Sequence, residues 1–112
     1  MNNTEKLAQR GAKVVMNTYS RFPIAFDHGQ GVYVWDMDGK KYLDFVAGIA
    51  VNSLGYSHPK LCAKIAEQCQ KLMHVSNLYY TEPQITLAEE LCEHSCFDKV
   101  FFCNSGAESI ES

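Results

Sequence analysis

The segment Lys99–Glu108 constrains the fold of this 112-residue chain more than any other. Its four consecutive apolar residues, Val100–Cys103, are typical of a short strand buried on both faces of an α/β sheet. Residues Asn104–Gly106 break the apolar run, and Ala107–Glu108 favours the start of a helix. The sequence therefore predicts a strand, a tight turn and a helix in direct succession.

The turn between that strand and that helix is a candidate anion site. It points several free backbone N–H groups, and the positive end of the helix, at one place. Gly106 lets a bound group approach the backbone, and the Ser105 hydroxyl offers a further hydrogen bond. A phosphate suits this arrangement. The alternative is a corner that binds nothing, because the segment has neither the Lys-Ser/Thr pair of a Walker loop nor a GxGxxG turn.

The composition is that of one globular domain at most, with 46% hydrophobic and 21% charged residues. A net charge of -3 with no basic cluster argues against nucleic acid or an anionic membrane as a partner. No apolar run is long enough to span a bilayer. The polar segment Met1–Gly11 lacks the apolar core of a secretory signal, so we expect a cytoplasmic protein.

The chain has five cysteines, an odd number, and no CxxC pair. This pattern indicates free thiols in a reducing compartment and not a disulfide framework. Cys92, His94 and Cys96 invite a metal-site interpretation. Residues two apart on a helix face different directions and no second ligand cluster follows, so small buried thiols are the favoured interpretation.

A β-hairpin is the clearest local prediction. Val32–Trp35 and Lys41–Phe45 flank Asp38–Gly39, and this pair tolerates the positive φ of a two-residue turn. The apolar run Phe45–Leu54 follows and is predicted to be buried and irregular, not a regular helix.

Three helices are predicted from apolar periodicity. A weakly amphipathic helix covers Asn3–Met16 and needs a partner surface to be stable. A second helix begins at Ser57–Pro59, capped by the serine or the histidine, with the proline in its first turn. The third begins at Thr81 with Gln84 at capping-box spacing and ends near His94. The second helix is expected to pack on a core through one broad apolar face: Leu61, Cys62, Ile65, Ala66, Cys69, Leu72 and Met73.

The segment Asn17–Pro23 is predicted to be an extended linker, because a proline biases the preceding residue away from helix. It carries Tyr19, with a hydrogen-bonding ring, and Arg21, with a fixed charge. From spacing alone, a plain surface loop is the favoured interpretation of this segment.

Taken together, these segments resemble the opening of the class III pyridoxal-phosphate-dependent aminotransferases. Within that family the resemblance is strongest to the acetylornithine aminotransferases, through Gly48–Val51 and His74–Tyr79. The motifs occur in the family's order along nearly the whole chain: Tyr19–Pro23, Gly31–Asp36, Asp38–Lys40, Tyr42–Phe45, Ala47–Val51, Leu54–Pro59, His74–Tyr79 and Phe101–Glu108.

The resemblance implies the N-terminal portion of an α/β, fold-type I transferase. Residues 1–80 would contribute to the small domain and the dimer interface, and residues 81–112 would begin the large cofactor-binding domain. The implied enzyme is a homodimer of arginine biosynthesis that moves an amino group between N-acetylornithine and 2-oxoglutarate through pyridoxal 5'-phosphate. Its partners would be small amino acids and 2-oxo acids.

The resemblance also implies roles for four residues. The backbone at Gly106 and Ala107 would hold the cofactor phosphate, with the Ser105 hydroxyl nearby, and Tyr19 would contact the substrate. In the family a lysine forms the Schiff base with the cofactor, an aspartate pairs with its ring nitrogen and an arginine binds the substrate carboxylate. No lysine of this chain lies in that context. No catalytic residue is therefore assigned, and the 112 residues alone are expected to be inactive and poorly stable or associating.

Two departures from the family pattern are visible. Tyr56 stands where relatives often have histidine, and Ser109–Ile110 follows Glu108 where alanine and asparagine are usual. The second departure suggests a frameshift or truncation near this point. Two alternatives remain: another class III aminotransferase, acting on ornithine, succinylornithine or 4-aminobutyrate, or a catalytically dead remnant.

Overall fold

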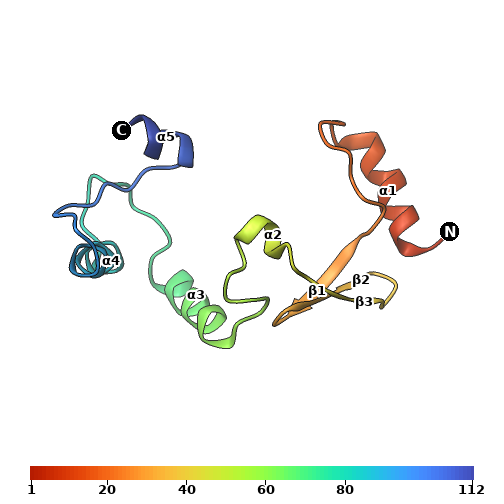
Figure 1. Cartoon of the computed structure of the whole chain (residues 1–112), viewed down its shortest axis with the longest axis horizontal. Coiled ribbons are helices and arrows are strands. Elements are labelled where there is room, and N and C mark those ends of the chain that lie inside the picture. Colours follow the sequence, from red (N-terminus) through yellow and green to blue (C-terminus); the bar gives the residue numbers. More distant parts are fainter. The chain divides into compact units, whose positions relative to one another are not determined.

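The computed structural model describes all 112 residues, which form two compact units, Met1–Lys71 and Leu72–Ser112. Figure 1 labels the elements of both. The first unit contains α1 (Asn3–Val14), β1 (Phe26–Gln30), β2 (Tyr33–Asp36), β3 (Lys41–Leu43), α2 (Ala47–Ala50) and α3 (Pro59–Lys71). The second contains α4 (Glu82–Glu93) and α5 (Gly106–Glu111). The predicted assignment of 1–80 to a small domain and 81–112 to a large one stays a prediction.

The sheet has three antiparallel strands in the order β1-β2-β3. The predicted hairpin is confirmed as β2 and β3, but its two-residue turn is wrong. The Asp36 N–H donates to the Lys40 carbonyl over 3.0 Å, so a three-residue loop connects the strands. Gly39 alone takes a positive φ in this loop, +83°. A three-residue loop with its last residue in the left-handed region matches the twist of a hairpin.

A buried carboxylate holds this loop in place. Asp36 Oδ1 accepts hydrogen bonds from the Asp38 N–H (3.0 Å) and the Lys40 N–H (2.8 Å). Asp36 Oδ2 accepts from the Tyr42 hydroxyl over 2.9 Å. The Lys40 N–H is the largest cause that lowers the pKa of Asp36, and the bond to Asp36 raises the pKa of Tyr42. The ionised carboxylate is therefore part of the loop structure.

The first helix, α1, begins as predicted and ends two residues earlier, at Val14, because Val15 is extended. Asn2 and Glu5 form a capping box at its start. The Asn3 N–H also donates to Asp38 Oδ1 over 3.0 Å, which ties α1 to the hairpin loop.

The two middle helices begin and end close to the predicted residues. Pro59 opens α3, and His58 Nδ1 accepts from the Leu61 N–H at 3.4 Å. Helix α4 begins after Thr81 and ends at Glu93, with His94 as its C-cap, but the predicted capping box does not form. The Thr81 side chain makes no capping bond. Gln84 Nε2 instead donates to Asn77 Oδ1 over 3.2 Å.

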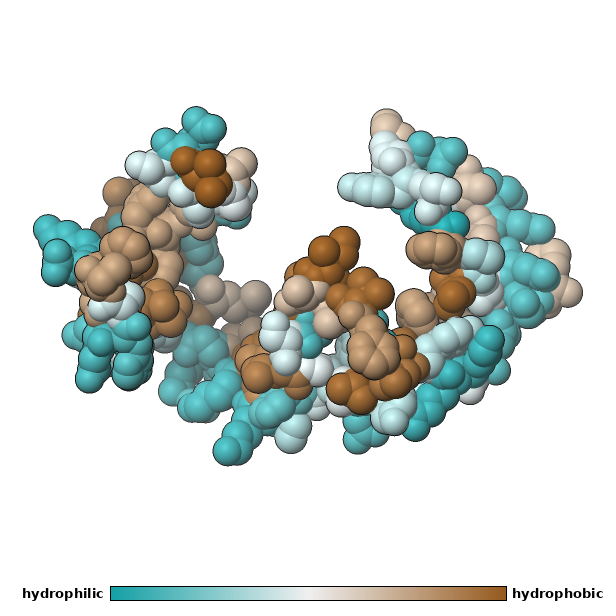
Figure 2. Space-filling view, viewed as in Figure 1, coloured by the Kyte–Doolittle hydropathy of each residue, from teal (hydrophilic) through white to brown (hydrophobic).

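The apolar segments that the sequence predicts to be buried are mostly exposed in the structure. Val34 is the one buried hydrophobic residue, and apolar side chains lie at the surface of both units (Figure 2). The run Phe45–Leu54 is irregular as predicted but exposed, with Phe45 at 91% of its full accessibility. The apolar face of α3 is also exposed, including Leu61 and Ile65.

The predicted strand Val100–Cys103 is wrong. The segment pairs with no other strand, and Phe101 is 71% exposed. A parallel-type strand needs neighbouring strands for its backbone hydrogen bonds, and residues 1–112 supply none beside it. None of the helices is both long enough and apolar enough to cross a membrane.

Candidate cofactor and substrate sites

The turn at Ser105 has the local geometry that its sequence predicts. Ser105 is the N-cap of α5 with an extended backbone, and its Oγ accepts from the Glu108 N–H over 3.3 Å. The Ser105 hydroxyl in turn donates to Glu108 Oε2 over 3.0 Å. The predicted helix start is confirmed, and it begins at Gly106.

The donors needed by an anion are present at this turn. The backbone N–H groups of Gly106 and Ala107 donate to no other group of the chain, and both residues are exposed. A Cβ added to Gly106 would meet nothing within 4 Å, so the space beside the turn is open. Two free N–H groups and one hydroxyl suit a phosphate. Glu108 competes for the Ser105 hydroxyl, so an anion would have to replace that bond.

Ser109, one of the two departures from the family pattern, has a structural role in this turn. Its Oγ lies 2.9 Å from Cys103 Sγ and donates to the Ser105 carbonyl over 3.2 Å. It thereby links the extended segment to the first turn of α5. Ile110 is 85% exposed and nothing in the structure explains it.

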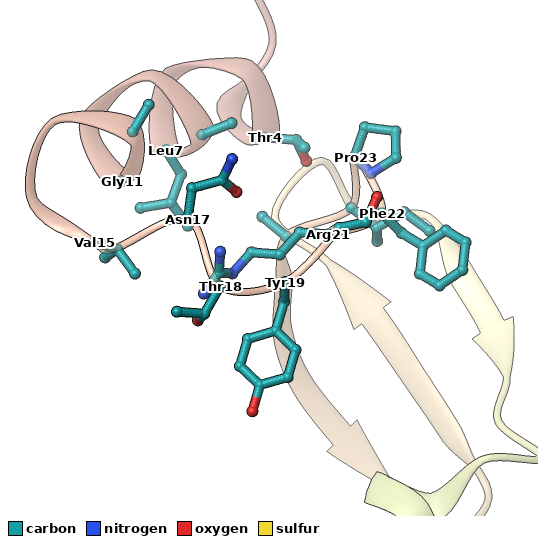
Figure 3. Close-up of a pocket in the computed structure, with 15 residues that line it drawn as sticks. Thr4, Leu7, Gly11, Val15, Asn17, Thr18, Tyr19, Arg21, Phe22 and Pro23 are labelled. Carbon is teal, nitrogen blue, oxygen red and sulfur yellow. The ribbon is translucent and has the colours of Figure 1, made fainter.

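Tyr19 lies in the first unit, beside a groove of about 870 Å³ between α1 and the linker that follows it. Leu7, Gly11 and Val15 of this region line the groove. Figure 3 shows the Tyr19 ring pointing away from α1. The ring is 72% exposed, and its hydroxyl has no hydrogen-bond partner. The linker is an exposed loop, as the spacing favours.

Arg21 is a neighbour of Tyr19 whose contact the sequence does not reveal. Its Cζ lies 5.8 Å from the centre of the Tyr19 ring, within the range of a cation–π interaction. The one sequence feature that could have indicated this contact is the spacing of Tyr19 and Arg21, because residues two apart in an extended segment lie on the same side of the backbone. Arg21 makes no ion pair with an acidic residue.

The cysteines and the other potential metal ligands form no site. No group of three or more His, Cys, Asp or Glu side chains is arranged to hold a metal ion, and Cys92, His94 and Cys96 do not form one. All five cysteines are free thiols. Asp44 and Tyr56, which no motif singled out as a pair, form a short hydrogen bond of 2.6 Å.

Comparison with known proteins gives consistent results. Residues 14–112 match the model of the aminotransferase class-III family. The chain is 61% identical over 98 residues to an acetylornithine aminotransferase of Synechocystis, covering 88% of this chain and 23% of that protein. The chain spans about a quarter of the length of the curated relatives it matches.

Solved structures agree with the fold. The crystal structure of acetylornithine aminotransferase from Elizabethkingia anophelis matches with a TM-score of 0.92 at 35% identity, over 99% of this chain and 29% of that one. The ornithine aminotransferase of Toxoplasma gondii matches with a TM-score of 0.91 at 27% identity, over 99% of this chain and 26% of that one. The predicted α/β fold, the N-terminal portion of a pyridoxal-phosphate-dependent transferase, is confirmed.

Proposed function

This chain belongs to the aminotransferase class-III family, and from that premise we propose that it is the N-terminal part of an acetylornithine aminotransferase. Such an enzyme moves an amino group between N-acetylornithine and 2-oxoglutarate, a step of arginine biosynthesis. The observation that carries the proposal is the 61% identity to a relative of that name. The similarity to an ornithine aminotransferase is lower, at 27% identity, so ornithine is the less favoured substrate.

The turn at Ser105 is the proposed site for the phosphate of pyridoxal 5'-phosphate. Support comes from the free N–H groups of Gly106 and Ala107, the open space beside Gly106 and the Ser105 hydroxyl. Pyridoxal phosphate, when bound, supplies an electron sink for reactions at the substrate Cα. These three residues would bind and orient the phosphate end, and they hold no proton for the reaction.

Tyr19 is the proposed substrate contact. Its exposed ring and free hydroxyl can donate or accept a hydrogen bond at the edge of the groove beside α1. No side chain of this chain is proposed as the general base, so the 112 residues alone should not turn over substrate. We further propose a cytoplasmic homodimer. The five free thiols support a reducing compartment, and the exposed apolar surface of Met1–Lys71 supports association.

Turnover by the natural polypeptide that carries this sequence tests the proposal. Purified from its source, it should transaminate N-acetylornithine with 2-oxoglutarate and use ornithine less efficiently. The isolated 112-residue chain should show no turnover. If the natural polypeptide had no transaminase activity on either substrate, the proposal would be refuted. A preference for ornithine would favour an ornithine aminotransferase instead.

A substitution at Gly106 tests the phosphate site. Gly106→Ala should leave α5 intact, since the new methyl meets no atom of the chain, but should crowd a bound phosphate. We expect the dissociation constant for pyridoxal phosphate to rise roughly tenfold or more, because such a rise corresponds to the loss of one charge-assisted hydrogen bond. Gly11→Ala, also in open space on a helix, is the matched control. Unchanged affinity in Gly106→Ala would place the phosphate elsewhere.

A further inference from the structure

Four consecutive residues of the first unit, Ala47–Ala50, have positive φ values between 50° and 65°. Three of the four carry a Cβ, and such residues rarely adopt this left-handed conformation. The Ala50 N–H donates to the Val46 carbonyl over 3.0 Å, so the segment is a hydrogen-bonded left-handed turn. Strain of this kind persists only where surrounding contacts enforce it.

Asp44 supplies the first of these contacts. Its Oδ1 accepts from the Val46 N–H over 2.8 Å, and its Oδ2 accepts from the Ala47 N–H over 3.0 Å. The carboxylate therefore binds both amides at the entrance to the turn. Asp44 is itself placed by its own N–H, which donates to the Val32 carbonyl over 2.9 Å.

Tyr56 supplies the second contact, to the same carboxylate oxygen that accepts from the Ala47 N–H. Its hydroxyl donates to Asp44 Oδ2 over 2.6 Å, across 12 residues of sequence. The backbone of Tyr56 pairs with Gly31 through two hydrogen bonds of 2.8 and 2.9 Å. The Tyr56 ring lies against Gly29, where an added Cβ would come within 2.5 Å of it. The phenol is thus fixed on the edge of the sheet before it reaches Asp44.

We propose that Asp44 and Tyr56 form a clamp that holds the left-handed turn Ala47–Ala50, with Tyr56 as a positioning residue that fixes the rotamer of Asp44. The turn presents an apolar side chain outward, because Ile49 is 88% exposed. The clamp determines where that side chain lies. This inference does not depend on the proposed substrate or cofactor.

The clamp should stay closed over a wide range of pH. The Tyr56 hydroxyl is the largest cause that lowers the pKa of Asp44, and the bond to Asp44 is the largest cause that raises the pKa of Tyr56. The side chain of Asn52 also bonds to Tyr56, and no charged group outside the pair contributes to either shift. Asp44 therefore stays ionised below its ordinary pKa of 3.8, and Tyr56 keeps its proton above 10.0.

Hydrogen exchange of the natural polypeptide, measured by mass spectrometry, tests the clamp. In Tyr56→Phe, which removes only the hydroxyl, amides of the peptide 45–54 should exchange roughly tenfold faster or more, as for the loss of a charge-assisted hydrogen bond. The peptide 26–36 should exchange at the original rate, since the backbone bridge to Gly31 remains. Tyr80→Phe, at an exposed tyrosine with no hydroxyl partner, should change neither peptide.

A histidine variant separates a clamp from simple packing. In Tyr56→His, the imidazole loses its charge roughly between pH 5 and 8. Protection of the peptide 45–54 should then fall several-fold as pH rises through that range, or be low throughout if the imidazole does not reach Asp44. In the unmodified protein it should be constant. Unchanged protection in Tyr56→Phe, or an unprotected turn in the unmodified protein, would overturn the proposal.

Discussion

The units Met1–Lys71 and Leu72–Ser112 both expose their apolar side chains, but they differ in how their polar groups are satisfied. In the first unit, side-chain and backbone hydrogen bonds join segments far apart in sequence, such as Asn3 with Asp38 and Gly31 with Tyr56. In the second, one side-chain bond of this kind is present, from Asn77 Nδ2 to the Phe102 carbonyl at 3.4 Å. Its other side-chain hydrogen bonds, around Asn77 and Ser105, join residues two to seven apart.

The difference shows what each unit can specify without an apolar core. Hydrogen bonds between distant backbone segments orient the hairpin, the turn after it and the start of α1. In the second unit, the cap at Ser105 specifies only where α5 begins, and α4 begins at Glu82 with a proline in its first turn and no side-chain cap. We therefore expect the first unit to retain defined contacts in solution and the second to depend more on surfaces that bury its apolar residues.

The largest effect is expected from Gly55→Ala, which breaks the long-range contacts of the first unit. Gly55 has a φ of +77°, and an added Cβ would lie 2.7 Å from the Gly31 carbonyl oxygen. Left-handed strain alone costs about 1–3 kcal/mol. Exchange of the Gly31 and Tyr56 amides should accelerate accordingly, by roughly tenfold for each 1.4 kcal/mol.

Gly11→Ala is the control for that experiment. Gly11 lies inside α1 with no atom within 4 Å of an added Cβ. Alanine should stabilise the helix by about 1 kcal/mol and leave the bridge between Gly31 and Tyr56 unchanged. If the Gly31 and Tyr56 amides exchanged no faster in Gly55→Ala than in Gly11→Ala, the bridge between Gly31 and Tyr56 would not hold the first unit together.

The parts of the fold that could be predicted are those specified by neighbouring residues. The hairpin follows from Asp38–Gly39 between apolar alternating segments, and α3 follows from Pro59 and its apolar period. The sequence does not predict the strand β1, because Phe26–Gln30 contains Asp, His and Gly and shows no alternation of apolar and polar residues. It is a strand because β2 pairs with it and because Gly29 leaves room for the Tyr56 ring.

The candidate site divides in the same way. The start of α5 could be predicted because Asn104–Gly106 break the apolar run just before Ala107–Glu108. The Ser105 cap itself is not among the predictions from sequence, although a serine followed three residues later by glutamate is a local signal for such a cap. The bond between Asp44 and Tyr56 joins two polar residues 12 apart across an irregular segment, and no period or motif marks it. The predicted burial of Val100–Cys103 is wrong. An apolar run indicates that a segment is stabilised by burial, but it does not show that residues 1–112 contain the strands that would bury it.

A smaller effect is expected from Asn77→Ala, which tests the one long-range side-chain bond of the second unit. The change removes the bond to the Phe102 carbonyl and the acceptor of Gln84 Nε2. Each neutral hydrogen bond contributes about 1 kcal/mol. Limited proteolysis within residues 97–104 should accelerate several-fold. Gln70→Ala, which removes an exposed amide, is the control, and equal cleavage of both variants would show that Asn77 does not order this segment.

The smallest effect is expected at Glu67, whose contacts in the first unit are local and exposed. Glu67 pairs with Lys64 at 2.8 Å and Lys71 at 3.0 Å on α3, and Lys64 is the larger cause that lowers its pKa from 4.5 to about 2. A carboxyl pKa that is lower in the folded state stabilises α3 above pH 4.5, and this contribution is lost as pH falls towards 2.

The helical circular dichroism of the unmodified chain should therefore fall slightly more between these pH values than that of Glu67→Gln, and added salt should reduce the difference. Glu89→Gln, at an exposed residue of α4, should follow the unmodified chain. If Glu67→Gln and the unmodified chain lost helix identically at low salt, the two lysine pairs would contribute nothing to α3. Local, exposed contacts would then contribute less than long-range hydrogen bonds within the first unit, as they do when the first unit is compared with the second.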